Sequence, residues 1–104
     1  MILNITEKSE FDKIIQTNEL VIVDFWATWC GPCRMLGTVI DEYSNENPDA
    51  VLVKINVDDA KGLASDYDVA SLPTIMIFKN GNINASKIGY LTKSVFEKYI
   101  SDNK

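Results

Sequence analysis

Hydrophobic residues occur along the chain in short runs that predict five β-strands. The runs Leu20–Trp26 and Val51–Val57 are nearly continuous and rich in β-branched and aromatic residues, which is typical of strands covered on both faces. Three further strands are expected at Ile2–Ile5, at Thr74–Lys79 and at Ile83 to about Ile88. Asn80-Gly81 joins the last two and is a strong hairpin signal, so we expect that pair to be antiparallel.

Between the strands, hydrophobic residues at intervals of three and four predict four helices. In the first, Phe11, Ile14 and Ile15 share one face, and Thr6 and Ser9 are candidate N-caps. The others are expected at Pro32 to about Asn47, at about Ala60 to Tyr67, and from about Thr92 onward. The order β-α-β-α-β-α-β-β-α indicates an α/β sandwich with parallel strands crossed over by helices and one antiparallel hairpin.

Composition supports one globular unit. No internal repeat, low-complexity run or linker interrupts the chain, so residues 1–104 are expected to form a single domain. Of these residues 46% are hydrophobic, and area scaling predicts that folding buries about two-thirds of the surface, enough for a core without metals. The net charge of −5 argues against nucleic acid or an anionic membrane as a partner.

Two cysteines and the absence of histidine narrow the possible chemistry. Without histidine the chain has no Ser-His or Cys-His dyad and no histidine-ligated metal site, so no bound metal is expected. The N-terminal residues lack the pattern of a secretory signal, and no apolar stretch approaches the roughly 20 residues of a transmembrane helix. One cysteine pair is too few for a disulfide-stapled secreted protein, so a cytoplasmic location is expected.

The candidate chemistry lies in Trp29-Cys30-Gly31-Pro32-Cys33, which follows a predicted buried strand and opens a predicted helix. The helix N-terminus would stabilise a thiolate and lower the pKa of the Cys30 thiol toward neutrality. Cys33, one turn inside the helix, would be shielded and able to attack the Cys30 sulfur of a mixed disulfide. Two weaker interpretations are a zinc half-site, for which the remaining ligands are lacking, and a structural disulfide, whose small loop would stabilise little.

The segment Val23–Cys33 resembles the active-site signature of the thioredoxin family. Further matches cover essentially the whole chain in the family's order: Lys54, Asn56 and Asp58, Leu72-Pro73-Thr74, Phe78-Lys79-Asn80-Gly81, and Gly89. The resemblance implies the thioredoxin fold, a three-layer α/β/α sandwich with a mixed five-stranded sheet and four helices.

The same resemblance implies a protein disulfide reductase that carries two electrons from a reductase to target proteins. Cys30 would be the nucleophile and Cys33 the resolving thiol, and the redox-active disulfide Cys30–Cys33 would take the place of a bound cofactor. The expected partners are an NADPH-linked or ferredoxin-linked thioredoxin reductase and diverse disulfide-containing proteins. The protein itself is expected to be a monomer.

Asp24 is the candidate acid–base group. It lies in the middle of an apolar strand, where desolvation should raise the pKa of its carboxyl group. In the family interpretation it removes the proton from Cys33, directly or through a water, and the absence of histidine leaves it as the strongest candidate for the base. The alternative is a buried carboxylate that is merely satisfied by Lys54 on the neighbouring strand.

A second site element is Ser71-Leu72-Pro73-Thr74. Sequence alone favours a trans Leu72–Pro73 bond and a proline that simply starts a strand. The resemblance implies a cis Pro73 facing the cysteines, with the Leu72 backbone free to bind an extended target segment.

A flat, mostly uncharged platform around Cys30 is expected from Trp29, Gly31, Pro32, Leu72, Gly89 and Tyr90. Gly31 and Pro32, between the cysteines, and Lys54 are expected to tune the active site. Trp26 has two interpretations, a core aromatic or a side chain packed against the active-site loop. Asp58 is interpreted as an ordinary charge at the end of a strand.

The chain departs from the family pattern at two places. Gly37-Thr38 stands where the family usually has Ala-Pro, whose proline kinks the helix, and we predict that the helix still bends near Gly37. Tyr90 occupies a position where small residues are common, so it could narrow the target groove.

Two other functions remain open at this stage. An oxidase or isomerase would use the same thiols in the opposite direction, although Gly-Pro between the cysteines resembles the reducing class. A noncatalytic binding module would use only the hydrophobic platform, and the intact cysteine pair makes this interpretation secondary.

Overall fold

A computed structural model describes all residues from Met1 to Lys104, with one five-stranded sheet at its centre. The strands are β1 (Ile2–Asn4), β2 (Leu20–Trp26), β3 (Val51–Asn56), β4 (Thr74–Lys79) and β5 (Asn82–Ile88), in the spatial order β1-β3-β2-β4-β5. β1, β3 and β2 are parallel, whereas β4 is antiparallel to β2 and β5 is antiparallel to β4. The sheet is therefore mixed, as the hairpin signal predicts.

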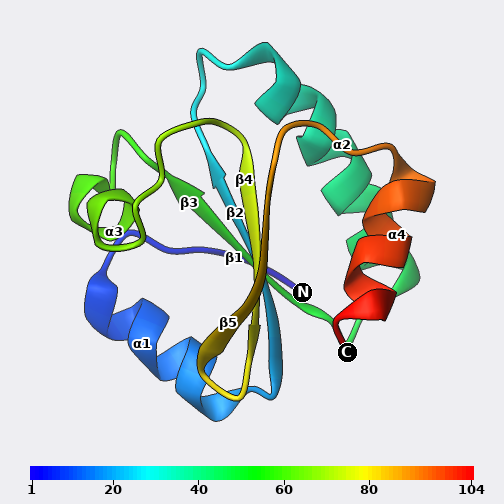
Figure 1. Cartoon of the computed structure of the whole chain (residues 1–104), viewed down its shortest axis with the longest axis horizontal. Helices are drawn as coiled ribbons and strands as arrows, with labels where there is room; N and C mark the ends of the chain where they lie inside the picture. The colour runs from blue at the N-terminus through cyan, green and yellow to red at the C-terminus, as the bar shows by residue number, and fades with distance from the viewer.

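Four helices cover the two faces of this sheet. They are α1 (Lys8–Thr17), α2 (Gly31–Glu46), α3 (Lys61–Asp66) and α4 (Lys93–Asp102). Figure 1 shows α1 and α3 on one side of the strands and α2 and α4 on the other. The expected three-layer α/β/α sandwich with a mixed five-stranded sheet and four helices is confirmed.

Each face of the sheet has its own hydrophobic core. Phe11 of α1 and Leu63 of α3 belong to one cluster, and Leu36 of α2 and Phe96 of α4 belong to the other. Side chains alternate along β2, so that Val21, Val23 and Phe25 enter the first core and Ile22 enters the second. The same alternation directs Asp24 toward the face covered by α2 and α4.

Most boundaries agree with the predicted elements to within a few residues, but the N-cap of α1 does not. The cap is Glu7, with extended backbone angles and no side-chain hydrogen bond, so the expectation of Thr6 or Ser9 is wrong. Ser9 lies inside the first turn and Thr6 lies outside it, because the helix begins at Lys8. Thr92 does cap α4, where its hydroxyl accepts a hydrogen bond from the Val95 N–H. None of the helices combines the length and the hydropathy needed to cross a membrane.

Candidate active site

The two cysteines lie where the chain leaves β2 and enters α2. Cys30 is the N-cap of α2, with φ −97° and ψ 110°, and Pro32 lies in the first turn, where its missing N–H removes no helical hydrogen bond. Cys30 and Cys33 form a disulfide, with their Cα atoms 5.2 Å apart. The Cys33 N–H donates a hydrogen bond of 3.2 Å to the Cys30 sulfur, which is therefore held at the positive end of the helix.

The cysteines differ in exposure, since 7% of Cys30 and 2% of Cys33 is accessible to solvent. Together with Ala27 they form a small buried cluster, against which Trp26, Val57 and Leu72 pack. Of the two interpretations of Trp26, the contact with the active-site loop is the one that this packing supports.

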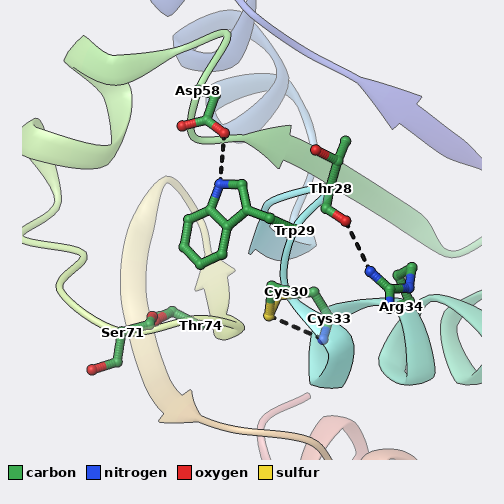
Figure 2. Close-up of a disulfide and its surroundings, with 8 residues drawn as sticks. All are labelled: Thr28, Trp29, Cys30, Cys33, Arg34, Asp58, Ser71 and Thr74. Atoms are coloured by element: carbon green, nitrogen blue, oxygen red, sulfur yellow. Dashed lines mark hydrogen bonds between the residues drawn. A yellow bond between two sulfur atoms is a disulfide. The ribbon is translucent and has the colours of Figure 1, made fainter.

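Trp29 stands out from the surface beside Cys30, with 68% of it exposed. Its indole N–H donates a hydrogen bond of 2.9 Å to an Asp58 carboxylate oxygen (Figure 2). Asp58 is thus a site residue that the sequence interpretation missed, and it is not an isolated strand-end charge. Its placement directly after β3 was the available signal, because Trp29 follows the parallel neighbour β2 at the same edge of the sheet.

An apolar groove of about 510 Å³ lies beside the disulfide. Its lining residues are Trp29, Cys30, Gly31, Pro32, Val57, Val69, Ala70 and Leu72. Of the expected platform, Gly89 and Tyr90 do not line this groove. Gly89, in a left-handed conformation with φ 101°, donates its N–H to the Pro73 carbonyl at 2.8 Å, and 38% of Tyr90 is exposed next to it.

The Leu72–Pro73 peptide bond is cis, as the family resemblance implies. Leu72 is half-buried and lines the groove, whereas Pro73 is buried. Thr74 donates its hydroxyl to the Ser71 carbonyl, so a side-chain hydrogen bond closes the turn around the proline. These contacts hold the turn that contains Leu72 beside the groove that Cys30 also lines.

Asp24 is buried, with 2% of it exposed, and neither of its carboxylate oxygens has a hydrogen-bond partner. Burial raises the pKa of Asp24 to about 7 from an ordinary 3.8, and the positive charge of Lys54 opposes part of this shift. The predicted direction is therefore confirmed.

Lys54 pairs with Asp24 in the register of β2 and β3, yet the two side chains form no ion pair. The Lys54 ammonium lies 4.8 Å from the centre of the Trp26 ring, in cation–π geometry. The alternative in which Lys54 merely satisfies the carboxylate is not supported, because both Asp24 oxygens lack partners.

The unusual Gly37 of α2 is buried on the side that faces Lys54. A Cβ atom at Gly37 would meet the Lys54 nitrogen at 3.7 Å, an ordinary van der Waals distance. The bend near Gly37 stays a prediction. No group of three or more cysteine, aspartate or glutamate side chains is arranged to hold a metal ion.

Comparisons with known proteins agree with this geometry. The family model described as Thioredoxin matches residues 2–102. The thioredoxin of Rickettsia typhi is 45% identical over 102 residues, which are 97% of each chain. That of Mycoplasmoides gallisepticum is 37% identical over 97 residues, 93% of this chain and 97% of the relative. A Plasmodium falciparum thioredoxin structure superposes with a TM-score of 0.90 at 34% identity, covering 98% of this chain and 99% of its own.

These relatives match the chain over nearly its whole length, and in this chain the Cys30–Cys33 disulfide lies at the start of α2. The chain belongs to the thioredoxin family of disulfide oxidoreductases.

Proposed function

We propose that this chain reduces protein disulfides with Cys30 as the attacking sulfur, Cys33 as the resolving thiol and Asp24 as the proton acceptor. The observation that carries the proposal is the Cys30–Cys33 disulfide at the N-terminus of α2. Cys30 is the N-cap of this helix and also lines an apolar groove. Cys30 is the more exposed of the two cysteines and lines the groove, so it is the one that a target can reach.

The reaction takes two exchange steps from the reduced form. The Cys30 thiolate attacks one sulfur of the target disulfide, and the other target sulfur leaves as a thiolate. Cys33 then loses its proton and attacks the Cys30 sulfur of the mixed disulfide, which releases the second target thiolate and forms the Cys30–Cys33 disulfide. The target gains two electrons, and the oxidised protein regains two electrons from a reductase.

Asp24 suits the second step because its pKa is about 7, so near neutral pH it can accept a proton and release it again. With both oxygens unpartnered and no histidine in the chain, it is the buried group available to take the Cys33 proton, directly or through a water. The positive charge of Lys54 lowers this pKa and so opposes part of the effect of burial.

The groove would bind an extended target segment through apolar contact and through the Leu72 backbone. Trp29, Gly31 and Pro32 form the side of the groove on the active-site loop. Gly89 and Tyr90, beside Pro73 and outside the groove, would extend the target contact beyond it.

Members of this family are reduced by thioredoxin reductase and act on disulfide-containing targets. A solved structure at 33% identity and TM-score 0.89 comes from work on thiol resolution in yeast mitochondrial 1-Cys peroxiredoxin. For this chain we propose an NADPH-linked or ferredoxin-linked reductase, a cytoplasmic location and a monomeric state, which fit the single thiol pair and the net charge of −5.

The test is the reduction of insulin with dithiothreitol as the electron source, together with the midpoint potential of the Cys30–Cys33 couple. We expect the wild type to accelerate reduction, Cys30→Ser to abolish the acceleration, and the potential to lie below that of glutathione. A potential well above that of glutathione would favour an oxidase. Full biological activity of the Cys30→Ser/Cys33→Ser variant would favour a noncatalytic binding module.

A further inference from the structure

The two exposed residues before Cys30, Thr28 and Trp29, are held to the rest of the molecule by few contacts. Most of Trp29 is exposed, so packing alone restrains it little, and Thr28 is exposed as well. Trp29 nevertheless forms one side of the groove. The position of this side of the groove therefore depends on the hydrogen bonds that hold the Thr28–Trp29 segment.

One of these hydrogen bonds comes from Arg34, in the first turns of α2. Its guanidinium donates a hydrogen bond of 2.9 Å to the Thr28 carbonyl, the one hydrogen bond that this carbonyl receives (Figure 2). The Arg34 main-chain N–H also donates to the Cys30 carbonyl at 3.2 Å. The same residue thus holds the chain on both sides of the Trp29–Cys30 peptide bond.

The opposite flank is held by Asp58. This carboxylate accepts the Trp29 indole N–H, and its own main-chain N–H donates to the Asn56 side chain at 3.0 Å. Figure 2 shows the two hydrogen bonds reaching the segment from different directions, one from the loop after β3 and the other from α2. A charged partner on each flank restrains a segment that the hydrophobic core does not.

We propose that Arg34 is a positioning residue for target binding, which fixes the Thr28–Trp29 segment through the Thr28 carbonyl and so keeps Trp29 in place as the side of the groove. The inference rests on the proposed function, because it assigns the groove to protein targets. The proposal predicts different effects of Arg34 on two kinds of substrate. A protein disulfide needs the groove, whereas a small aromatic disulfide needs only the Cys30 sulfur.

The test compares Arg34→Met, which keeps the length of the side chain and removes both charge and donor, with Arg34→Lys, which retains both. Lys98→Met is the matched control, because it removes an exposed cation from α4 that bonds only to Asp102. Each variant is assayed with insulin and with 5,5′-dithiobis(2-nitrobenzoate) at pH 9. Amide hydrogen exchange of Cys30, whose N–H donates to the Ala27 carbonyl, is measured separately in the oxidised protein.

We expect Arg34→Met to raise the KM for insulin and the exchange rate of the Cys30 amide by about three- to tenfold, the range of one lost hydrogen bond. The rate with the small disulfide and the kcat for insulin should stay within about twofold, Arg34→Lys should recover most of the loss, and Lys98→Met should match the wild type.

Unchanged amide exchange in Arg34→Met would overturn the proposal. So would an equal loss with insulin and the small disulfide, since that pattern assigns the effect to the charge of Arg34 acting on the sulfur. A wild type that reduces neither substrate would contradict the proposed function instead. The exchange measurement on the oxidised protein does not depend on that activity, so the two failures are distinguishable.

Discussion

Asp24 is unfavourable to the fold as a buried carboxyl group, and the same burial suits its proposed role as a proton acceptor. Its two carboxylate oxygens are buried without partners, an arrangement that disfavours the charged form and raises the pKa of the group to about 7. A carboxyl group with an ordinary pKa would be almost wholly ionised at neutral pH. It would be too weak a base to accept the Cys33 proton efficiently. The same burial that weakens the fold would thus prepare Asp24 for the proposed proton transfer from Cys33.

Replacing Asp24 by asparagine should slow the resolution of the mixed disulfide at neutral pH by at least about tenfold, because the amide cannot accept the Cys33 proton. The rate of this step in the wild type should rise with pH through about 7, where Asp24 loses its proton, and Asp24→Asn should lack that rise. Stopped-flow measurement of target release from pH 5 to 9 checks both. An unchanged rate at pH 7 would remove Asp24 from the mechanism.

The same substitution should stabilise the fold above neutral pH. The unfolded carboxyl group loses its proton near pH 3.8 and the folded one near 7, so the folded state binds more protons in between and stability falls as pH rises across that window. At pH 8 Asp24→Asn should raise the free energy of unfolding by up to about 4 kcal/mol, and at pH 4 by much less. Urea denaturation at the two pH values measures the difference, and equal effects at both would contradict the assignment.

The sequence was sufficient to predict the surroundings of residues whose environment is set mainly by their neighbours along the chain. Asp24 lies among apolar strand residues, and Cys30 lies at a predicted helix start. Asp58 and Arg34 were missed as contacts because their partners, Trp29 and Thr28, are reached through the tertiary fold. Lys54 lies over the Trp26 ring and forms no ion pair with Asp24. The positions of Lys54 and Asp24 on neighbouring strands did not predict this orientation.

The helix α2 contributes both to the active site and to the core, since it begins at the two cysteines and covers part of one face of the sheet. It begins at Gly31, directly after Cys30, and runs for 16 residues to Glu46, with Gly37 in its interior. A glycine inside a helix is unfavourable by up to about 1 kcal/mol relative to alanine, so its presence at a buried position needs a reason. The sequence predicts a bend of the helix near Gly37, and such a bend requires glycine only if alanine cannot adopt it.

Gly37→Ala decides whether this glycine is needed. The added methyl group would lie 3.7 Å from the Lys54 nitrogen, so it fits without a clash. We expect the free energy of unfolding to rise by about 0.5 to 1 kcal/mol, the gain in helix propensity, as measured by urea denaturation. A loss of stability would show that α2 relies on the freedom of Gly37 beyond what a bend with alanine allows.

The strands were predicted more closely than the helix ends. β2 and β4 have the predicted bounds, because runs of β-branched and aromatic residues begin and end abruptly at polar or turn residues. The start of α1 was misplaced because its N-cap, Glu7, forms no side-chain hydrogen bond and so lacks the usual sequence signature. Capping rules predict the helix ends that use them, such as Thr92.

For the whole molecule, the alternation of strands and helices was enough to predict the layers, and the hairpin signal was enough to predict the antiparallel edge. The placement of β1 beside β3, and of β2 between β3 and β4, follows from contacts between distant segments. That order brings the ends of β2 and β3 together, and with them Trp29 and Asp58. The groove beside Cys30 is a property of this assembly and of no single segment.

The acidic balance of the chain leads to a prediction about its assembly. A net charge of −5 on 104 residues favours repulsion between copies, so we expect a monomer in both redox states. Sedimentation equilibrium of the reduced and the oxidised protein should give 11.7 kDa in each case. A dimer in either state would contradict this expectation and would show that attraction between exposed side chains outweighs the repulsion of the net charge.

The proposed roles of Cys30 as the attacking cysteine and Cys33 as the resolving cysteine are tested most directly by trapping the mixed disulfide. Without Cys33 the complex with a target cannot be resolved, so Cys33→Ser incubated with cell extract should accumulate disulfide-linked adducts. Mass spectrometry should map these adducts to Cys30, and dithiothreitol should release them. Cys30→Ser should accumulate few, because Cys33 is the more deeply buried sulfur. Equal trapping by the two variants, or adducts that map to Cys33, would contradict the proposed roles.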